Sequence, residues 1–161
     1  MRAVPVLAFA LLASSSAAQQ AVPTADFVLV DKSERVLTLY ADGRPFHAIA
    51  GLQLGAAPEG HKQFEGDERT PEGRYTIDFA HPDSSFWLSL HISYPNAQDR
   101  AYAEAHGRSP GGAVFIHGQP NWLALGRVPG DWTDGCIALS NAEIELLWQT
   151  VPDGTPIEIR P

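Results

Sequence analysis

Cysteine is the residue that this sequence most nearly lacks, since Cys136 is the only one among 161 residues. A single thiol cannot close a disulfide within the chain, and it cannot supply the paired cysteines of structural zinc sites. The H-E-x-x-H and G-x-S-x-G patterns and phosphate-binding glycine loops are missing as well. We therefore expect no metal and no cofactor. Three roles stay open for Cys136: a buried inert thiol, half of an intermolecular disulfide, or a nucleophile.

Positive charge is scarce too. Lysine and arginine number 11 against 19 aspartates and glutamates, which gives a net charge of −8. Nucleic acid requires a basic footprint for its phosphates, so this balance excludes a nucleic-acid partner.

No apolar run in the sequence is long enough to span a bilayer comfortably. The run over residues 3–13 follows Arg2 and precedes Ser16 and Ala18, which stand as in an A-x-A cleavage site. We expect residues 1–18 to be a signal peptide cleaved after about Ala18, and the protein to be exported to the periplasm or cell envelope. The mature chain, residues 19–161, then has no integral membrane segment and the size of one domain, which we expect to be a monomer.

The mature chain has the pattern of a mainly β protein. Strands are predicted where Val, Ile, Leu, Thr and Tyr gather between turn residues, at Phe27–Val30, Arg35–Tyr40, Pro45–Ala50, Arg74–Ala80, Phe86–Ser93, Ala113–Ile116, Ile137–Leu139 and Pro156–Arg160. Asn96 can cap a helix over Ala97–His106, and Ser140 with Glu143 forms a capping box for a second helix. We expect a β-sandwich or barrel with one or two short covering helices.

A nucleophilic Cys136 needs a base, and all six histidines precede it in the sequence. The papain order, in which the histidine follows the cysteine, is therefore excluded. His117 is the best candidate because it ends an apolar strand and Gly118 lets the chain turn sharply after it. Gly135 permits an unusual backbone, so that its N–H and that of Cys136 could face a developing oxyanion. A hydrogen-bonded core histidine stays open as the alternative role of His117.

The sequence Ile116-His117-Gly118, with T-D-G-C at Thr133–Cys136 placing the cysteine 19 residues after the histidine, resembles the signature of L,D-transpeptidase catalytic domains, the YkuD family. The segment Gly66–Ile77 resembles the family's TP-x-G-x-Y segment. Leu88–Ala103 and the C-terminal DWTDGCIALSNAEIELLW…VPDGTPIEI are similar to the YafK-like branch. The resemblance extends from about Phe27 to Pro161.

This resemblance implies a YkuD-like fold and an enzyme that acts on peptidoglycan stem peptides. It implies Cys136 as nucleophile, His117 as general base, the Gly118 carbonyl as the group that orients the imidazole, and the Gly135 N–H as an oxyanion-hole donor. The thiolate attacks the carbonyl on the L-centre of diaminopimelate and expels the terminal D-alanine. An amine or water then resolves the thioester. Transfer and hydrolysis, including release of a wall-linked lipoprotein, both stay open.

Two positions depart from the wider family, in which many members have His in place of Asp134 and Asn or Arg in place of Ala138. The resemblance to the YafK-like branch, where hydrolytic release of a lipoprotein is described, includes the same departures.

An acidic stem peptide needs cationic and polar partners. We predict Arg108, Arg127, Asp134 and Tyr94 as substrate-binding residues, with Lys62 as a weaker candidate. The alternative function is a non-catalytic periplasmic domain that binds peptidoglycan, in which Trp87, Trp122 and Trp132 would stack on sugars.

Overall fold

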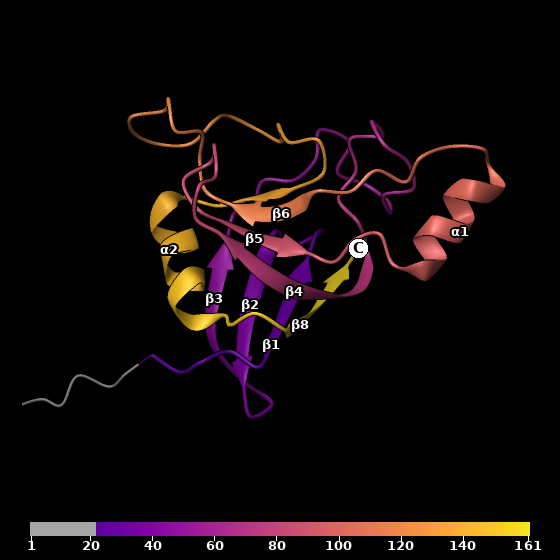
Figure 1. The fold of residues 1–161 in the computed structure, drawn as a ribbon. Coiled ribbons are helices and arrows are strands. Elements are labelled where there is room, and N and C mark those ends of the chain that lie inside the picture. The colour runs from indigo at the N-terminus through magenta and orange to yellow at the C-terminus, as the bar shows by residue number, and fades with distance from the viewer. Residues whose placement is uncertain (1–21) are drawn as a thin grey trace, which may run out of the picture.

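Strands make up most of the secondary structure of residues 22–161, which are the residues that the computed structural model describes (Figure 1). The strands are β1 (Phe27–Asp31), β2 (Val36–Ala41), β3 (Arg44–Ala50), β4 (Gly73–His81), β5 (Ser89–Ile92), β6 (Val114–His117), β7 (Ile137–Ala138) and β8 (Thr155–Arg160). The helices are α1 (Ala97–Ala105) and α2 (Asn141–Thr150). The signal peptide expected over residues 1–18 lies outside the described residues. Between residues 22 and 161, no helix has both the length and the apolar character needed to cross a membrane.

The eight strands described form one sheet in the order β3-β2-β1-β8-β4-β5-β6-β7. β1, β2 and β3 pair antiparallel one after another, as their hairpin pattern predicts. β8 lies parallel to β1 and antiparallel to β4, so the last strand joins the first three to the others. The sheet curls, and in Figure 1 β5 and β6 cross above the ends of β1–β3. The predicted mainly β fold with few helices is confirmed.

The core lies on the inner face of this curled sheet. Alternate residues of the strands are fully buried there, among them Val28 and Val30 of β1 and Ile157 and Ile159 of β8. This period of two is what a half-buried strand requires. α2 covers the core with Ile144, Leu147 and Val151, the last being its C-cap. Each such side chain contributes about 1.5–3 kcal/mol through burial.

α1 does not cover the sheet, and it stands to one side of the molecule (Figure 1). It buries only Asp99 and Ala103, and neither belongs to the hydrophobic core cluster. The Asp99 carboxylate accepts a hydrogen bond from the Tyr75 hydroxyl at 3.0 Å and contacts His61 Nε2 at 3.0 Å. α1 therefore holds the loop before β4 in place, and α2 alone acts as a covering helix.

β5 begins three residues later than predicted. The strand was expected over Phe86–Ser93, but it starts at Ser89. Trp87 has φ +68°, which is outside the β region and rare for a bulky side chain. Phe86 and Trp87 therefore belong to the loop that reaches the site described next.

Candidate active site

His117 is the last residue of β6 and is 3 % exposed. Its Nδ1 lies 2.7 Å from the carbonyl oxygen of Gly118. A carbonyl can only accept, so Nδ1 carries the hydrogen and Nε2 keeps a free lone pair. Burial lowers the pKa of His117 below its ordinary value, and the Gly118 carbonyl partly offsets this. The imidazole is therefore neutral at neutral pH and able to take a proton at Nε2.

Glycine at position 118 is required by close packing. A Cβ there would lie 2.7 Å from Asn141 Oδ1 and 2.9 Å from Trp87 Cβ. The Gly118 N–H also donates to the Phe86 carbonyl at 3.0 Å. Helix α2, the 84–88 loop and the end of β6 thus meet at this residue, and together they fix the backbone that carries His117.

Cys136 lies directly before β7, beside β6. The Phe115 N–H donates to its Sγ at 3.3 Å, and Sγ lies 3.7 Å from the Ala113 carbonyl, which accepts the thiol hydrogen. Burial raises the pKa of the Cys136 thiol; the Phe115 N–H opposes this shift and the Asp134 charge adds to it. The resting group is therefore a protonated thiol and not a preformed thiolate.

The turn before Cys136 depends on Gly135, which has φ +130°. A Cβ at this position would lie 2.5 Å from the Arg69 carbonyl oxygen. The Gly135 N–H donates to Thr133 Oγ1 at 3.2 Å, and that hydroxyl donates to the Cys136 carbonyl at 2.7 Å. The Gly135 N–H thus has a side-chain acceptor in this structure, and its role in an oxyanion hole, which requires Thr133 Oγ1 to give way, stays a prediction. Within residues 22–161 no acceptor is assigned to the Cys136 N–H, which leaves it as the donor at this turn.

Two cavities meet at His117 and Cys136. The larger, of about 460 Å³, is also lined by Lys62, Glu65, Gly66, Gly111, Gly112, Val114, Trp132, Thr133 and Asp134. The smaller, of about 280 Å³, is also lined by His81, Asp83, Ser84, Ser85, Ser89 and Phe115. Phe86 and Ala113 line both. The thiol and the imidazole thus stand on a common wall that can be reached from two sides.

Aromatic rings hold the imidazole within this wall. The ring centroid of Phe86 lies 4.6 Å from that of His117, and that of Trp132 lies 5.6 Å away. These two rings lower the polarity around His117, in keeping with the direction of its pKa shift.

Of the four predicted substrate-binding residues, only Asp134 lines either of these two cavities. Arg108 stacks over the Phe64 ring at 4.0 Å. Arg127 donates to the Gly51 carbonyl at 2.6 Å and pairs with Glu143. Tyr94 is 2 % exposed, and its hydroxyl donates to the Pro110 carbonyl at 3.0 Å. None of these three lines either cavity, and each has partners within the protein.

The loop between β3 and β4 supplies part of the cavity wall, and Lys62, the weaker substrate-binding candidate, is among its lining residues. Its Lys62 donates to Asp67 at 2.8 Å and to the Phe64 carbonyl at 3.1 Å, so its charge is paired and its stem faces the cavity. Gln53 of the same loop forms a bridge with Ala138 of β7, with N–H···O distances of 3.1 and 2.8 Å. Besides the Lys62 prediction, the unusual length and glycine content of residues 51–69 are signals of this role in the sequence.

Among the residues described, no three His, Cys, Asp or Glu side chains come together in a way that could hold a metal ion. His117 and Cys136 supply this wall with an imidazole and a thiol, the groups of acid–base and nucleophilic chemistry.

The sequence matches the L,D-transpeptidase catalytic domain family, YkuD, over residues 25–159, and the chain belongs to this family. A curated relative within this family can also be named. The chain is 30% identical over 165 residues to the Escherichia coli (strain K12) protein named "Putative L,D-transpeptidase YafK", and the match covers 94% of this chain and 61% of that one.

Solved structures agree with this assignment. Pgp2 from Campylobacter jejuni, a helical cell shape determining protein, has a TM-score of 0.68 at 30% identity, over 85% of this chain and 48% of that chain. Bd1075 of Bdellovibrio bacteriovorus shares the fold, with a TM-score of 0.58 at 23% identity, over 84% of this chain and 48% of that chain. The chain thus spans about three fifths of the length of its curated relatives and about half of these two solved chains.

Proposed function

We propose that this protein is an exported cysteine acyl-transfer enzyme of the periplasm that acts on peptidoglycan stem peptides. The observation that carries the proposal is the shared wall of the two cavities, where Cys136 and His117 are both accessible to a ligand. Membership of the L,D-transpeptidase catalytic domain family supplies the substrate class.

The first half of the reaction forms a thioester. Sγ of Cys136 turns from the Ala113 carbonyl toward His117, whose Nε2 takes the thiol hydrogen. The sulfur attacks the carbonyl carbon on the L-centre of diaminopimelate, and the negative oxygen that develops accepts a hydrogen bond from the Cys136 N–H. The bond to the terminal D-alanine then breaks, and His117 returns the proton to the leaving amine.

The second half resolves the thioester. An amine or a water molecule gives its proton to His117 and attacks the thioester carbon. The bond from this carbon to Sγ then breaks, and His117 returns the proton to the leaving sulfur. With the acyl chain in one cavity, the other leaves a path to the same carbon. An amine gives a cross-link or an attached protein, and water gives hydrolysis, including release of a wall-linked lipoprotein.

The test is turnover of a defined tetrapeptide muropeptide, followed by mass spectrometry with and without an amine acceptor. Tripeptide alone indicates hydrolysis, and a dimer indicates transfer. Cys136→Ala and His117→Ala should abolish both products while the protein stays folded by circular dichroism. Full activity in either folded variant would refute the assignment. Binding of the muropeptide by the unmodified protein without any thioester trapped by a carbapenem would favour the non-catalytic peptidoglycan-binding domain instead.

A further inference from the structure

Trp87 combines a strained backbone with an exposed ring. Its φ of +68° is a conformation that a bulky residue rarely adopts and that costs about 1–3 kcal/mol. Its side chain is nevertheless 46 % exposed, so burial of the indole does not compensate for this cost. Strain of this kind persists where neighbouring contacts fix it, and it gathers at functional sites.

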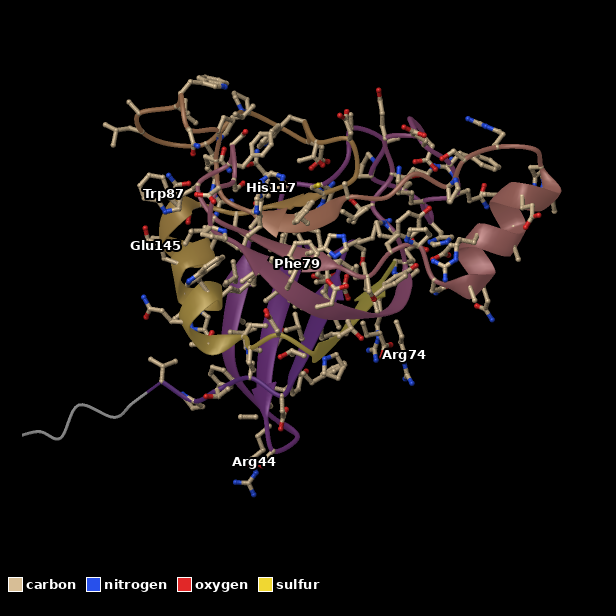
Figure 2. All side chains as sticks on the ribbon, in the orientation of Figure 1. Arg44, Arg74, Phe79, Trp87, His117 and Glu145 are labelled. Atoms are coloured by element: carbon tan, nitrogen blue, oxygen red, sulfur yellow. The ribbon has the colours of Figure 1, made fainter. Side chains whose placement is uncertain are left out.

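Contacts from three segments fix Trp87 in this conformation. Its backbone N–H donates to Asn121 Oδ1 at 2.7 Å, and its indole N–H donates to Glu145 Oε1 at 2.8 Å. Its Cβ packs where Gly118 has no side chain. Figure 2 shows Trp87 beside Glu145 on the outer side of α2, with His117 further in. An indole that is already immobile loses little conformational entropy when a ligand covers it.

A second exposed indole belongs to the residue next to Asn121, one of the residues that contact Trp87. Trp122 is 77 % exposed and is the next residue after Asn121. The Asn121 side chain bonds Trp87 through Oδ1 and the Ser84 carbonyl through Nδ2, at 2.8 Å, so it ties the two loops together. Phe86, the residue before Trp87, lines both cavities and stacks on His117. Trp87 packs beside Gly118, the residue after His117, and Trp122 follows the residue that bonds the Trp87 backbone. We call these two indoles the indole rim.

We propose that the indole rim binds saccharide rings of the glycan strand from which the stem peptide branches. A pyranose ring presents a flat face of C–H groups to an indole, and the second carboxylate oxygen of Glu145, whose Oε1 holds the Trp87 indole, can accept from its hydroxyls. These polar neighbours and the net charge of −8 disfavour an anionic lipid surface. Only the choice of glycan strand as the saccharide rests on the proposed function. In that function three stem residues separate the attacked carbonyl from the glycan, a length of about 10 Å in an extended chain, so the glycan passes near the thiol.

The binding test uses a ligand without peptide. The Cys136→Ala protein, which cannot react, is titrated with the β-1,4-linked tetramer of N-acetylglucosamine and followed by NMR of the ligand. Trp87→Ala in the same background should weaken binding about tenfold, and Trp87→Phe, which keeps a ring, should weaken it less. Tyr102→Ala is the matched control, because Tyr102 is an aromatic residue of similar exposure, 43 %, on α1. It should bind as the parent does.

The activity test separates this inference from the proposed function. The preference in kcat/KM for a glycan-linked tetrapeptide over the free tetrapeptide should fall about tenfold in Trp87→Ala and stay constant in Tyr102→Ala. Two results would overturn the inference: no binding of the tetramer by the parent, or equal binding by the parent and a folded Trp87→Ala. An equal loss on free and linked peptide would overturn it too, and would show that Trp87 serves the peptide or the fold. If the unmodified protein binds the tetramer but turns over neither substrate, the proposed function fails and the indole rim stands.

Discussion

Gly135→Ala should destabilise the protein more than Gly73→Ala, although the two glycines have nearly the same backbone conformation. Their φ values are +130° and +125°, so an alanine at either carries a similar strain of about 1–3 kcal/mol. The space around them differs. A Cβ at 135 would lie 2.5 Å from the Arg69 carbonyl oxygen, whereas the nearest atom at 73 would be Tyr75 Cε2 at 3.7 Å, an ordinary contact.

The difference between the two variants therefore isolates the clash. A backbone oxygen cannot rotate away as a side chain does, so either residues 66–70 or the turn that holds Cys136 must move. Such overpacking costs about 1–3 kcal/mol, which should appear as extra loss of unfolding free energy in Gly135→Ala.

Urea unfolding of both variants, with unchanged slopes, measures this difference directly. Turnover of the muropeptide should also fall in Gly135→Ala well beyond its fall in Gly73→Ala, because the displaced turn carries the thiol. Equal destabilisation of the two variants, within about 0.5 kcal/mol, would refute the reasoning and would mean that the turn relaxes without cost.

Further predictions concern titrating groups. Iodoacetamide should alkylate Cys136, the only thiol, slowly at neutral pH, and the alkylation rate should still be rising above pH 9.0, because burial raises the pKa of this thiol. A rate that reaches its plateau near pH 7 would contradict this. Burial lowers the pKa of His117, so its NMR titration should fall below 6.5. As pH falls below 6.5, the imidazole of the unfolded chain is protonated before that of the folded chain, so the free energy of unfolding should drop. The drop should be smaller in His117→Asn. The Asp131 carboxylate accepts from Nη1 and Nη2 of Arg35 at 2.6 and 2.7 Å and from the Leu54 N–H at 2.9 Å. Asp131→Asn should therefore lower the free energy of unfolding by about 1–3 kcal/mol, measured by urea unfolding. Burial raises the pKa of Asp131, but the bonds from Arg35 and Leu54 outweigh it and hold this pKa below its ordinary value of 3.8. The carboxylate's contribution to the free energy of unfolding should therefore be lost only as pH falls below about 3.8, and Asp131→Asn should lack this acid dependence.

The local parts of this molecule could be predicted from the sequence. Clusters of strand-forming residues between turns located the strands, and the predicted N-cap at Asn96 and capping box at Ser140 both occur in the structure. These signals are local because an N-cap needs only the next three residues. The spacing of His117 and Cys136 identified the family, and the family match confirms that identification.

Properties set by distant contacts could not be predicted. Arg127 was expected to bind substrate, but its partner Glu143 comes from the first turn of α2 and cannot be inferred from residues near 127. Trp87 lies within a segment of strand-forming residues, and its φ of +68° is imposed by Asn121 and Glu145, which are 34 and 58 residues away. The acceptor of the Gly135 N–H was missed for another reason: Thr133 is near in sequence, but the rotamer that places its hydroxyl cannot be inferred from the sequence.

The bridge between Gln53 and Ala138 has a consequence for how the candidate site can open. β7 is an edge strand of two residues, and the Gln53 backbone bonds close its outer side, so no second chain can pair with it there. The Gln53 side chain also donates to the Gly130 carbonyl at 2.6 Å and accepts from Gln119 at 3.1 Å. Two of the loops that line the larger cavity, residues 51–72 and 118–136, are thus bonded to each other and to the strand after Cys136. A separate outward movement of either loop at Gln53 would break these bonds, so we expect the two loops to move together with β7.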